Sequence, residues 1–171
     1  NSRTITSYMS KKKVTTFSDS KWEGLDINVD CFQRLYALKI DVYSTMYQFR
    51  LLHKTLTAND QLFKWKIETS PACSYCQIQR ETLRHLFTEC TVTRALWTQL
   101  IRWWNENVSE EDKKVLNESG MVGGIEIVNN ADILFNITLI EARIAIFKNR
   151  KKLAAPTLKQ IITAIINRAK T

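Results

Sequence analysis

The strongest constraint on this chain is a cluster of metal-ligand side chains with the spacing Cys73-x2-Cys76-x8-His85-x4-Cys90. It holds three of the four cysteines and one of the two histidines. A Cys-x-x-Cys turn presents two sulfurs on one side of a loop, and a helix would place His85 and Cys90 about one and a half turns apart. Three sulfurs and one nitrogen are typical of a tetrahedral zinc site, and four protein ligands leave no position for an activated water. We expect one structural Zn²⁺ on these four residues.

Two other interpretations of the same side chains stay open. Buried cysteines often act as small apolar groups, and a histidine is more often a core residue than a ligand. A Cys-His hydrolase would need Cys73, Cys76 or Cys90 as a free thiolate beside His85. Close spacing in a cysteine-poor chain favours zinc. Cys31 stands apart in an apolar segment, and we interpret it as a core thiol.

The composition predicts a helical protein. The chain has 171 residues, 44% of them hydrophobic, which is enough for one sizeable core. It has only four glycines and two prolines, and β-branched alternation is scarce. We expect a mostly α, small helical domain organised around one Cys-Cys-His-Cys zinc knuckle. A flexible basic arm (1–20) precedes a single domain (21–171), with a zinc module at about 58–105 and a helical part at about 109–171.

Several classes of protein are excluded by what the sequence lacks. No apolar run reaches the eighteen or so residues that cross a bilayer, and the first residues do not show the charged, apolar and small-residue pattern of a signal peptide. We therefore expect no membrane partner. The cysteines form no disulfide framework, which agrees with a reducing compartment.

The net charge of +8 is unevenly distributed. Residues 141–171 carry eight Lys or Arg and one acid, whereas residues 105–140 carry seven acids and two lysines. Such asymmetry favours a polyanionic partner, nucleic acid before membrane, although ordinary solvated lysines on helix faces produce it as well.

Apolar periodicity and capping residues predict the helices of the first two thirds of the chain. A short helix at 29–38 and a longer one at 42–54 come first, with His53 half-buried in the second. A third begins at Asn59, with Leu62, Phe63 and Trp65 along it and Lys64 and Lys66 outward. A helix at 92–106 uses Ala95, Leu96, Leu100, Trp103 and Trp104 to pack on the core rather than to stack on bases.

The last third of the chain has three expected helices. Ser109 and Asp112 form a capping-box pattern that begins a short acidic helix ending at Gly120. A helix of about twenty residues then carries an apolar stripe, made of Ile133, Ile137, Ile140, Ile144 and Phe147. Pro156 begins the last helix, whose buried face is Leu158, Ile161, Ile165 and Ala169.

The amino-acid sequence resembles a known family over about residues 20–105. The resemblance is weaker over the two expected helices that contain residues 140–152 and begin at Pro156. The segments that carry the resemblance are Phe49-Arg50-Leu51-Leu52-His53-Lys54, Asn59-Asp60-Gln61-Leu62-Phe63-Lys64-Trp65-Lys66-Ile67, Cys73-Ser74-Tyr75-Cys76 and Glu81-Thr82-Leu83-Arg84-His85-Leu86-Phe87, followed by Cys90 and Trp97. They resemble the zinc-binding region that follows the polymerase domain in LINE-type, non-LTR retrotransposon reverse transcriptases. In that family the Glu-Thr pair and the late Trp recur as regularly as the ligands.

The resemblance implies that this is a C-terminal piece of a transposable-element polyprotein, whose endonuclease and polymerase lie upstream. The residues agree with a non-catalytic role. There is no Asp-Asp pair for two-metal nucleotide transfer, no Ser-His-Asp arrangement and no phosphate-cradling glycine loop. Glu110, Glu111 and Asp112 are consecutive and would fan around a helix. We therefore expect no catalysis and no small-molecule substrate.

The expected function is to bind template RNA or target DNA for target-primed reverse transcription, in a cytoplasmic ribonucleoprotein and in the nucleus. Tyr75 is interpreted as stacking on a base or as covering the metal site. Six to ten phosphate contacts would lower affinity by about three to five orders of magnitude between ~50 and ~200 mM salt. The predicted phosphate contacts are Lys64, Lys66, Arg80, Arg84, Arg94, Arg143, Lys148, Arg150, Lys151 and Lys152. The alternative is an architectural module that braces the upstream reverse transcriptase domain or recruits a host protein.

Overall fold

A computed structural model describes residues 22–152 and 154–168. The described part is mostly helical and contains no β-strand, only one isolated antiparallel bridge between Ala72 and Arg80. This confirms the predicted fold class. The predicted arm (1–20) lies outside the described residues. In chain order the elements are α2 (Val29–Ala37), α3 (Val42–Leu52), α4 (Asn59–Lys64), the π-helix η2 (His85–Glu89), α5 (Thr91–Glu106), the 3-10 helix η3 (Glu110–Asp112), α6 (Glu118–Gly123), α7 (Asn130–Asn149), the 3-10 helix η4 (Arg150–Lys152) and α8 (Leu158–Arg168).

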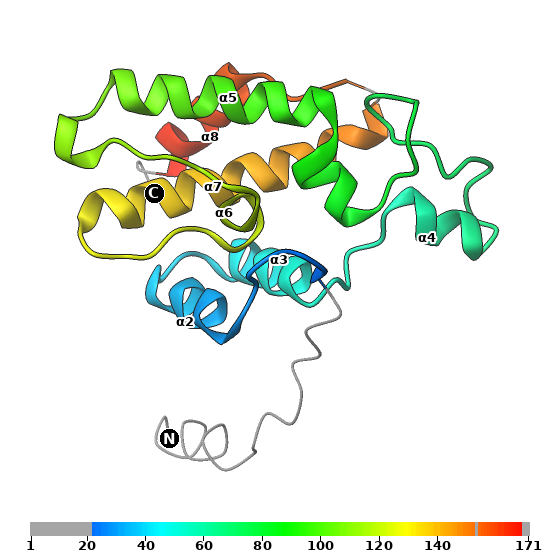
Figure 1. The fold of residues 1–171 in the computed structure, drawn as a ribbon, viewed down its shortest axis with the longest axis horizontal. Coiled ribbons are helices and arrows are strands. Elements are labelled where there is room, and N and C mark those ends of the chain that lie inside the picture. The colour runs from blue at the N-terminus through cyan, green and yellow to red at the C-terminus, as the bar shows by residue number, and fades with distance from the viewer. Residues whose placement is uncertain (1–21, 153, 169–171) are drawn as a thin grey trace, which may run out of the picture.

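The long helix α7 is the centre of the fold. Figure 1 shows it between α5 on one side and the α2–α3 pair on the other, and α8 packs along it. No described helix has the length and apolar character needed to cross a membrane. In contrast, α4 lies at the edge of the molecule in Figure 1, away from the other α-helices.

The apolar stripe predicted on α7 is only half of what the helix buries. Ile140 and Ile144 are buried, but Ile133, Ile137 and Phe147 are only partly so. Four other side chains on this helix are completely buried, namely Phe135, Leu139, Ala142 and Ile146. A helix that is apolar around most of its circumference belongs inside a core. The five-residue stripe therefore understated the burial of α7.

The predicted face of α5 packs on the core in part: Leu96, Leu100 and Trp104 are buried, Trp103 is partly buried and Ala95 is exposed. Trp97 is 1% exposed and Trp104 is 4% exposed, and the Trp104 ring lies 4.8 Å from that of Phe135 on α7. Both indoles donate a hydrogen bond, Trp97 to Phe87 O and Trp104 to Asp112 O. Buried tryptophans with satisfied N–H groups are core residues and not stacking platforms. Cys31 is also buried, as predicted.

The acidic segment folds differently from the prediction. Instead of one helix ending at Gly120, residues 110–112 form a single 3-10 turn and α6 begins after Asn117. The Asn117 side chain accepts a hydrogen bond from Gly120 N, which makes Asn117 the N-cap of α6. The helix ends at Gly124, whose φ of +83° is left-handed and whose Cβ position would lie 2.3 Å from Asn136 Oδ1. Only glycine fits this turn.

Three helices end in a lysine where glycine is usual. Lys39, Lys54 and Lys66 follow α2, α3 and α4 with φ values of 48°, 54° and 59°. A non-glycine residue in this left-handed region is strained by of order 1–3 kcal/mol. The positive charge offsets part of this cost because it lies at the negative end of the helix dipole.

Candidate metal centre

The turn that carries Cys73 and Cys76 is held by backbone hydrogen bonds. Cys73 N donates to Gln79 O at 2.7 Å, and Gln77 N donates to Cys73 O at 3.0 Å. Gln77 adopts φ +57°, so the chain reverses directly after Cys76. Both sulfurs therefore lie on the inner side of one tight turn, as the Cys-x-x-Cys spacing predicts.

His85 and Cys90 are brought together by a π-helix and not by the α-helix expected from the sequence. Cys90 N donates to His85 O at 2.7 Å, five residues back. The two ligands are thus one π-turn apart and not one and a half α-turns. Single π-turns are rare and occur often at functional sites. Cys90 is also the N-cap of α5, where the helix dipole favours a thiolate.

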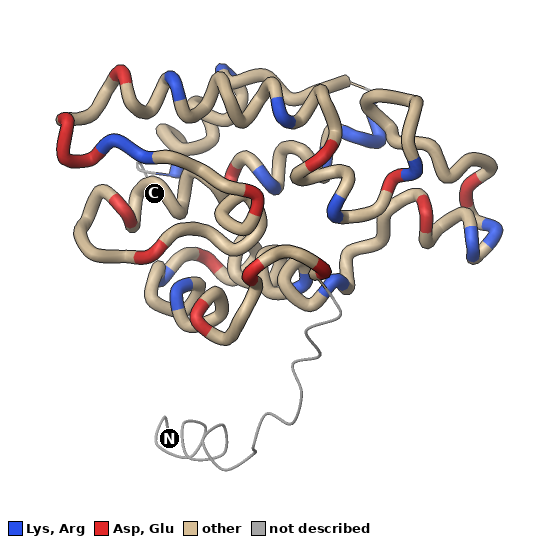
Figure 2. Tube along the Cα trace, viewed as in Figure 1, with Lys and Arg blue, Asp and Glu red and all other residues tan. Residues whose placement is uncertain are grey.

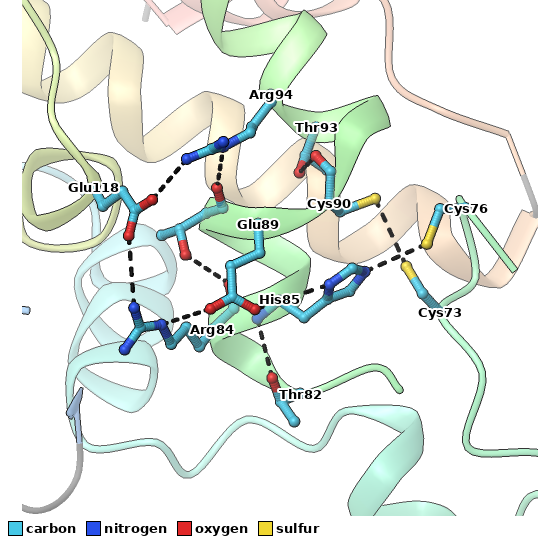
Figure 3. A network of polar contacts seen from close by, with 11 residues as sticks. Cys73, Cys76, Thr82, Arg84, His85, Glu89, Cys90, Thr93, Arg94 and Glu118 are labelled. Atoms are coloured by element: carbon cyan, nitrogen blue, oxygen red, sulfur yellow. Dashed lines mark hydrogen bonds and ion pairs between the residues drawn. The ribbon is translucent and has the colours of Figure 1, made fainter. Parts of the chain in front are cut away.

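The four ligand atoms converge on one point. Cys73 Sγ, Cys76 Sγ, the His85 ring and Cys90 Sγ lie within 4.8 Å of one another (Figure 3). The Cys73 and Cys90 sulfurs are 3.8 Å apart, and Cys76 Sγ lies 3.4 Å from His85 Nε2. In a tetrahedral zinc site with normal bond lengths, two sulfurs are about 3.8 Å apart and a sulfur and a nitrogen about 3.6 Å apart. The residues fit a zinc ion.

The electrostatics of the two buried sulfurs also fit a cation. The hydrogen bond from Cys73 lowers the pKa of the Cys90 thiol. The same bond, together with burial, raises the pKa of Cys73 well above its usual range. A divalent cation between the two sulfurs would permit both of them to be thiolates.

A carboxylate faces the other side of the His85 ring. Glu89 Oε2 lies 4.0 Å from His85 Nδ1, a buried nitrogen with no hydrogen-bond partner among the described residues. Glu89 in turn accepts a 2.7 Å bond from Arg84 Nε (Figure 3). A carboxylate on the distal nitrogen fixes the tautomer of a metal-binding histidine. Sequence reasoning missed Glu89, although its i,i+4 spacing from His85 was a usable signal.

Glu81 holds the metal-binding loop to the rest of the fold. It is completely buried and accepts hydrogen bonds from Ser74 N at 2.7 Å and from Asn59 N at 3.0 Å. Arg150, itself only 4% exposed, completes the set with a 2.7 Å ion pair. One carboxylate therefore ties the Cys-x-x-Cys turn to the start of α4 and to η4.

The other residues of the family pattern also have structural roles. Thr82 Oγ1 accepts a 3.0 Å bond from His85 N, at the start of the ligand-bearing turn. Trp97 Nε1 donates to Phe87 O, which joins α5 to η2. These contacts give a physical reason for the Glu-Thr pair and the late Trp to accompany the ligands.

Tyr75 lies between the metal loop and α7. It is half-buried, and its hydroxyl donates to Ile146 O. Burial raises the pKa of Tyr75, so the hydroxyl keeps the proton that it donates. Its position agrees with the covering role more closely than with base stacking.

Two residues predicted to contact phosphate are buried, and the structure corrects this prediction. Arg143 is 1% exposed and donates to Gln48 Oε1, Met121 O and Gly120 O. Arg150 is occupied by Glu81 and by Thr57 O. The two guanidinium groups join distant parts of the core and do not belong to an exposed basic surface. Burial lowers the pKa of Arg143 to about 9.

Four other predicted contacts, of which three are exposed and Arg84 is half-buried, already face carboxylates. Arg80 and Lys64 both pair with Asp60. Arg94 pairs with Glu118 at 2.6 Å, and Arg84 lies between Glu118 and Glu89 (Figure 3). Arg80 thus links the metal-binding loop to α4, and Arg84 and Arg94 link the ligand-bearing elements to α6, whereas the Lys64 pair lies within α4.

The predicted basic residues that remain are four lysines: Lys66, Lys148, Lys151 and Lys152. All four are exposed, and no ion pair within the described residues involves them. Lys148 Nζ lies over the Tyr43 ring at 4.7 Å. Figure 2 shows Lys and Arg interspersed with Asp and Glu over most of the trace. Of the ten basic residues predicted to contact phosphate, four are therefore both exposed and outside ion pairs among the described residues.

Fold and site together define a small helical domain with a Cys₃His site of zinc geometry. The family model described as "zinc-binding in reverse transcriptase" matches residues 9–97, which is just over half of the 171-residue chain and includes all four candidate ligands. The chain belongs to this family. No curated protein and no solved structure matches it.

Proposed function

We propose that this chain is the nucleic-acid-binding, non-catalytic C-terminal part of a LINE-type, non-LTR retrotransposon reverse transcriptase. It would hold template RNA or target DNA for the upstream polymerase domain during target-primed reverse transcription. The observation that carries this proposal is membership of a family defined by zinc binding in reverse transcriptases, with all four ligand positions inside the matched segment. The sequence resemblance to LINE-type proteins supports the other parts of the proposal, namely the type of retrotransposon, the C-terminal position and the binding of nucleic acid.

In this proposal Cys73, Cys76, His85 and Cys90 hold one zinc ion with a structural role. When bound, the ion supplies a cross-link between the Cys-x-x-Cys turn and the start of α5. Glu81, Arg150 and the Tyr75 hydroxyl then connect that turn to α7 and η4. The exposed lysines of η4 are in this way held in place relative to the metal loop.

The number of predicted lysines outside ion pairs sets the expected salt dependence of binding. Four contacts, from Lys66, Lys148, Lys151 and Lys152, replace the six to ten expected from the sequence. Each contact to a single strand contributes a slope of about −0.7 in log affinity against log salt. Affinity should therefore fall about 50-fold between ~50 and ~200 mM salt.

The test combines zinc analysis with binding. The zinc content of the purified chain is measured, and its affinity for a single-stranded RNA and for a duplex DNA is titrated across salt. Lys151→Gln with Lys152→Gln should make the salt slope shallower by about 1.4. Lys113→Gln is the matched control, because this exposed lysine already pairs with Glu110. Zinc without appreciable nucleic-acid affinity would refute the proposed function.

A second candidate function is supported by an exposed apolar face on α3. Val42, Tyr43 and Met46 are 78%, 55% and 51% exposed. Exposed apolar groups that lie together are typical of protein contacts. An architectural module that docks on the polymerase or recruits another protein would use such a face. It predicts that Met46→Glu prevents docking without changing RNA affinity.

A further inference from the structure

The end of α4 exposes aromatic side chains that the core does not use. Residues 63–67, here called the α4 platform, include Phe63 and Trp65, which are 40% and 54% exposed. No residue of α4 is buried, and the helix lies at the edge of the molecule in Figure 1. The sequence predicts both rings on a short helix, with Lys64 and Lys66 outward. Instead, the rings are exposed as well as the lysines.

The α4 platform has a fixed backbone. Lys66 N donates to Phe63 O at 3.0 Å, and both Ile67 N and Glu68 N donate to Leu62 O. Lys66 itself adopts the left-handed conformation, with φ +59°. These bonds close the last turn of the helix in the manner of a Schellman motif. Trp65 therefore lies on a preformed turn, so binding of a ligand there would cost little entropy for ordering the backbone.

The charges around Trp65 favour an anionic ligand. Lys64 and Lys66 flank it in sequence and are both exposed. The nearest acid on the helix, Asp60, is already paired with Lys64 at 3.0 Å and with Arg80. Glu68, after the platform, is the other acid of the segment. Lys66 has no ion-pair partner among the described residues and remains available to a phosphate.

A cleft leads from α4 toward the lysines of η4. It has a volume of about 400 Å³ and is lined by Asn59, Leu62, Glu68, Ser74, Arg150 and Lys151. One wall of the cleft is thus α4 itself, and another is the basic turn η4. Arg150 Nε is buried and has no hydrogen-bond partner within the described residues. The cleft therefore leads from α4, at Asn59 and Leu62, to a second cationic group, Lys151.

We propose that the α4 platform is a binding site for single-stranded nucleic acid, with one unpaired base stacked on Trp65 and the adjoining phosphates on Lys66 and Lys151. This inference rests on the proposed function and adds a site and a strand preference to it. Rings that alternate with lysines suit a ligand with aromatic faces and a charged backbone. A duplex keeps its bases stacked internally and cannot use Trp65 in this way.

The test compares the parent and three variants for binding to a single-stranded oligouridine and to an RNA duplex. Trp65→Ala should weaken single-strand binding about 5- to 150-fold, with the salt slope unchanged. Trp65→Phe keeps a ring and should lose less. Tyr36→Ala is the matched control, because Tyr36 is an aromatic residue of similar exposure (53%) on α2. Zinc content and the urea midpoint check that each variant is folded.

A cross-linking measurement on the unaltered chain is independent of how the variants fold. Ultraviolet cross-linking to an oligonucleotide that contains 5-iodouridine should place an adduct within residues 63–67. Adducts found only elsewhere, or a Trp65→Ala affinity within twofold of the parent, would overturn the inference and leave the proposed function standing. Failure of the parent chain to bind any RNA or DNA would overturn both. If Trp65→Ala instead changes only the sedimentation of the chain, the platform is a contact between copies and the inference is wrong.

Discussion

The buried ion pair between Glu81 and Arg150 gives the most direct test of how the metal loop is held. Glu81→Gln keeps the shape of the side chain and removes its charge. The Arg150 guanidinium would then be a buried cation without its counterion, and it has no other carboxylate partner among the described residues. The glutamine amide would also place its own N–H groups at a position where the carboxylate now accepts hydrogen bonds from Ser74 N and Asn59 N.

The size of the effect follows from this burial. Glu81 and Arg150 have side chains that are 0% and 4% exposed, so neither charge is screened by water. Removal of one partner from a buried pair typically costs about 3–5 kcal/mol, because the remaining charge stays uncompensated. The bonds from Ser74 N and Asn59 N belong to the same network, so their loss is included in this figure and not added to it. The change is a large fraction of the ~5–15 kcal/mol that stabilises a typical domain.

The assay is urea unfolding followed by far-ultraviolet circular dichroism, with zinc held in excess. Glu81→Gln should reduce the free energy of unfolding by about 3–5 kcal/mol, and Glu126→Gln, at an exposed position, should change it by less than about 0.5 kcal/mol. A double variant, Glu81→Gln with Arg150→Met, should recover part of the loss because no buried charge remains. A loss below about 1 kcal/mol, or strictly additive variants, would refute the role assigned to this pair.

Three further predictions concern other parts of the fold. Glu89→Gln should weaken zinc binding about 10- to 100-fold in competition with a chelator, because the carboxylate that faces His85 Nδ1 at 4.0 Å loses its charge; unchanged affinity would remove Glu89 from the site. Lys39→Gly should raise the free energy of unfolding by about 0.5–1 kcal/mol by relieving left-handed strain, measured as a higher thermal midpoint. Partial burial raises the pKa of Asp41, but hydrogen bonds from the first turn of α3 and from Arg168 lower it to about 2 overall. The stabilisation from Asp41 is therefore complete above about pH 4 and lost as the pH falls toward 2. Because the Asp41 side chain is 47% exposed, this stabilisation amounts to less than about 1 kcal/mol. Asp41→Asn should abolish this part of the pH dependence of the unfolding free energy.

The features that the sequence predicted well are local ones. The metal ligands lie within eighteen residues, and the turn that joins Cys73 and Cys76 depends on the residues between them. The bounds of α3 and α5 follow apolar periods of three and four. The exposure of the α4 rings was missed because a six-residue helix is too short for periodicity to distinguish an inner from an outer face. The π-turn was missed because no sequence signal separates it from an α-turn.

The roles of the arginines depend on distant partners and could not be predicted. Arg143 donates to Gln48, 95 positions away, and Arg150 pairs with Glu81, 69 positions away. In the sequence both belong to a basic stretch on a late helix, which is equally consistent with a solvated or ligand-binding face. Only the packing of α7 against α3 and the metal loop shows that these charges are internal.

The same contacts make the metal site and the η4 lysines parts of one structure. Arg150 begins η4 and is fixed by Glu81, while Tyr75, next to a ligand, donates to Ile146 on α7. Loss of the metal would therefore displace Lys151 and Lys152, although neither is a ligand. A ligand variant such as Cys76→Ser consequently cannot separate a direct metal role in nucleic-acid binding from a structural one. The charge variants can, because they leave Glu81, Arg150 and the four ligands in place.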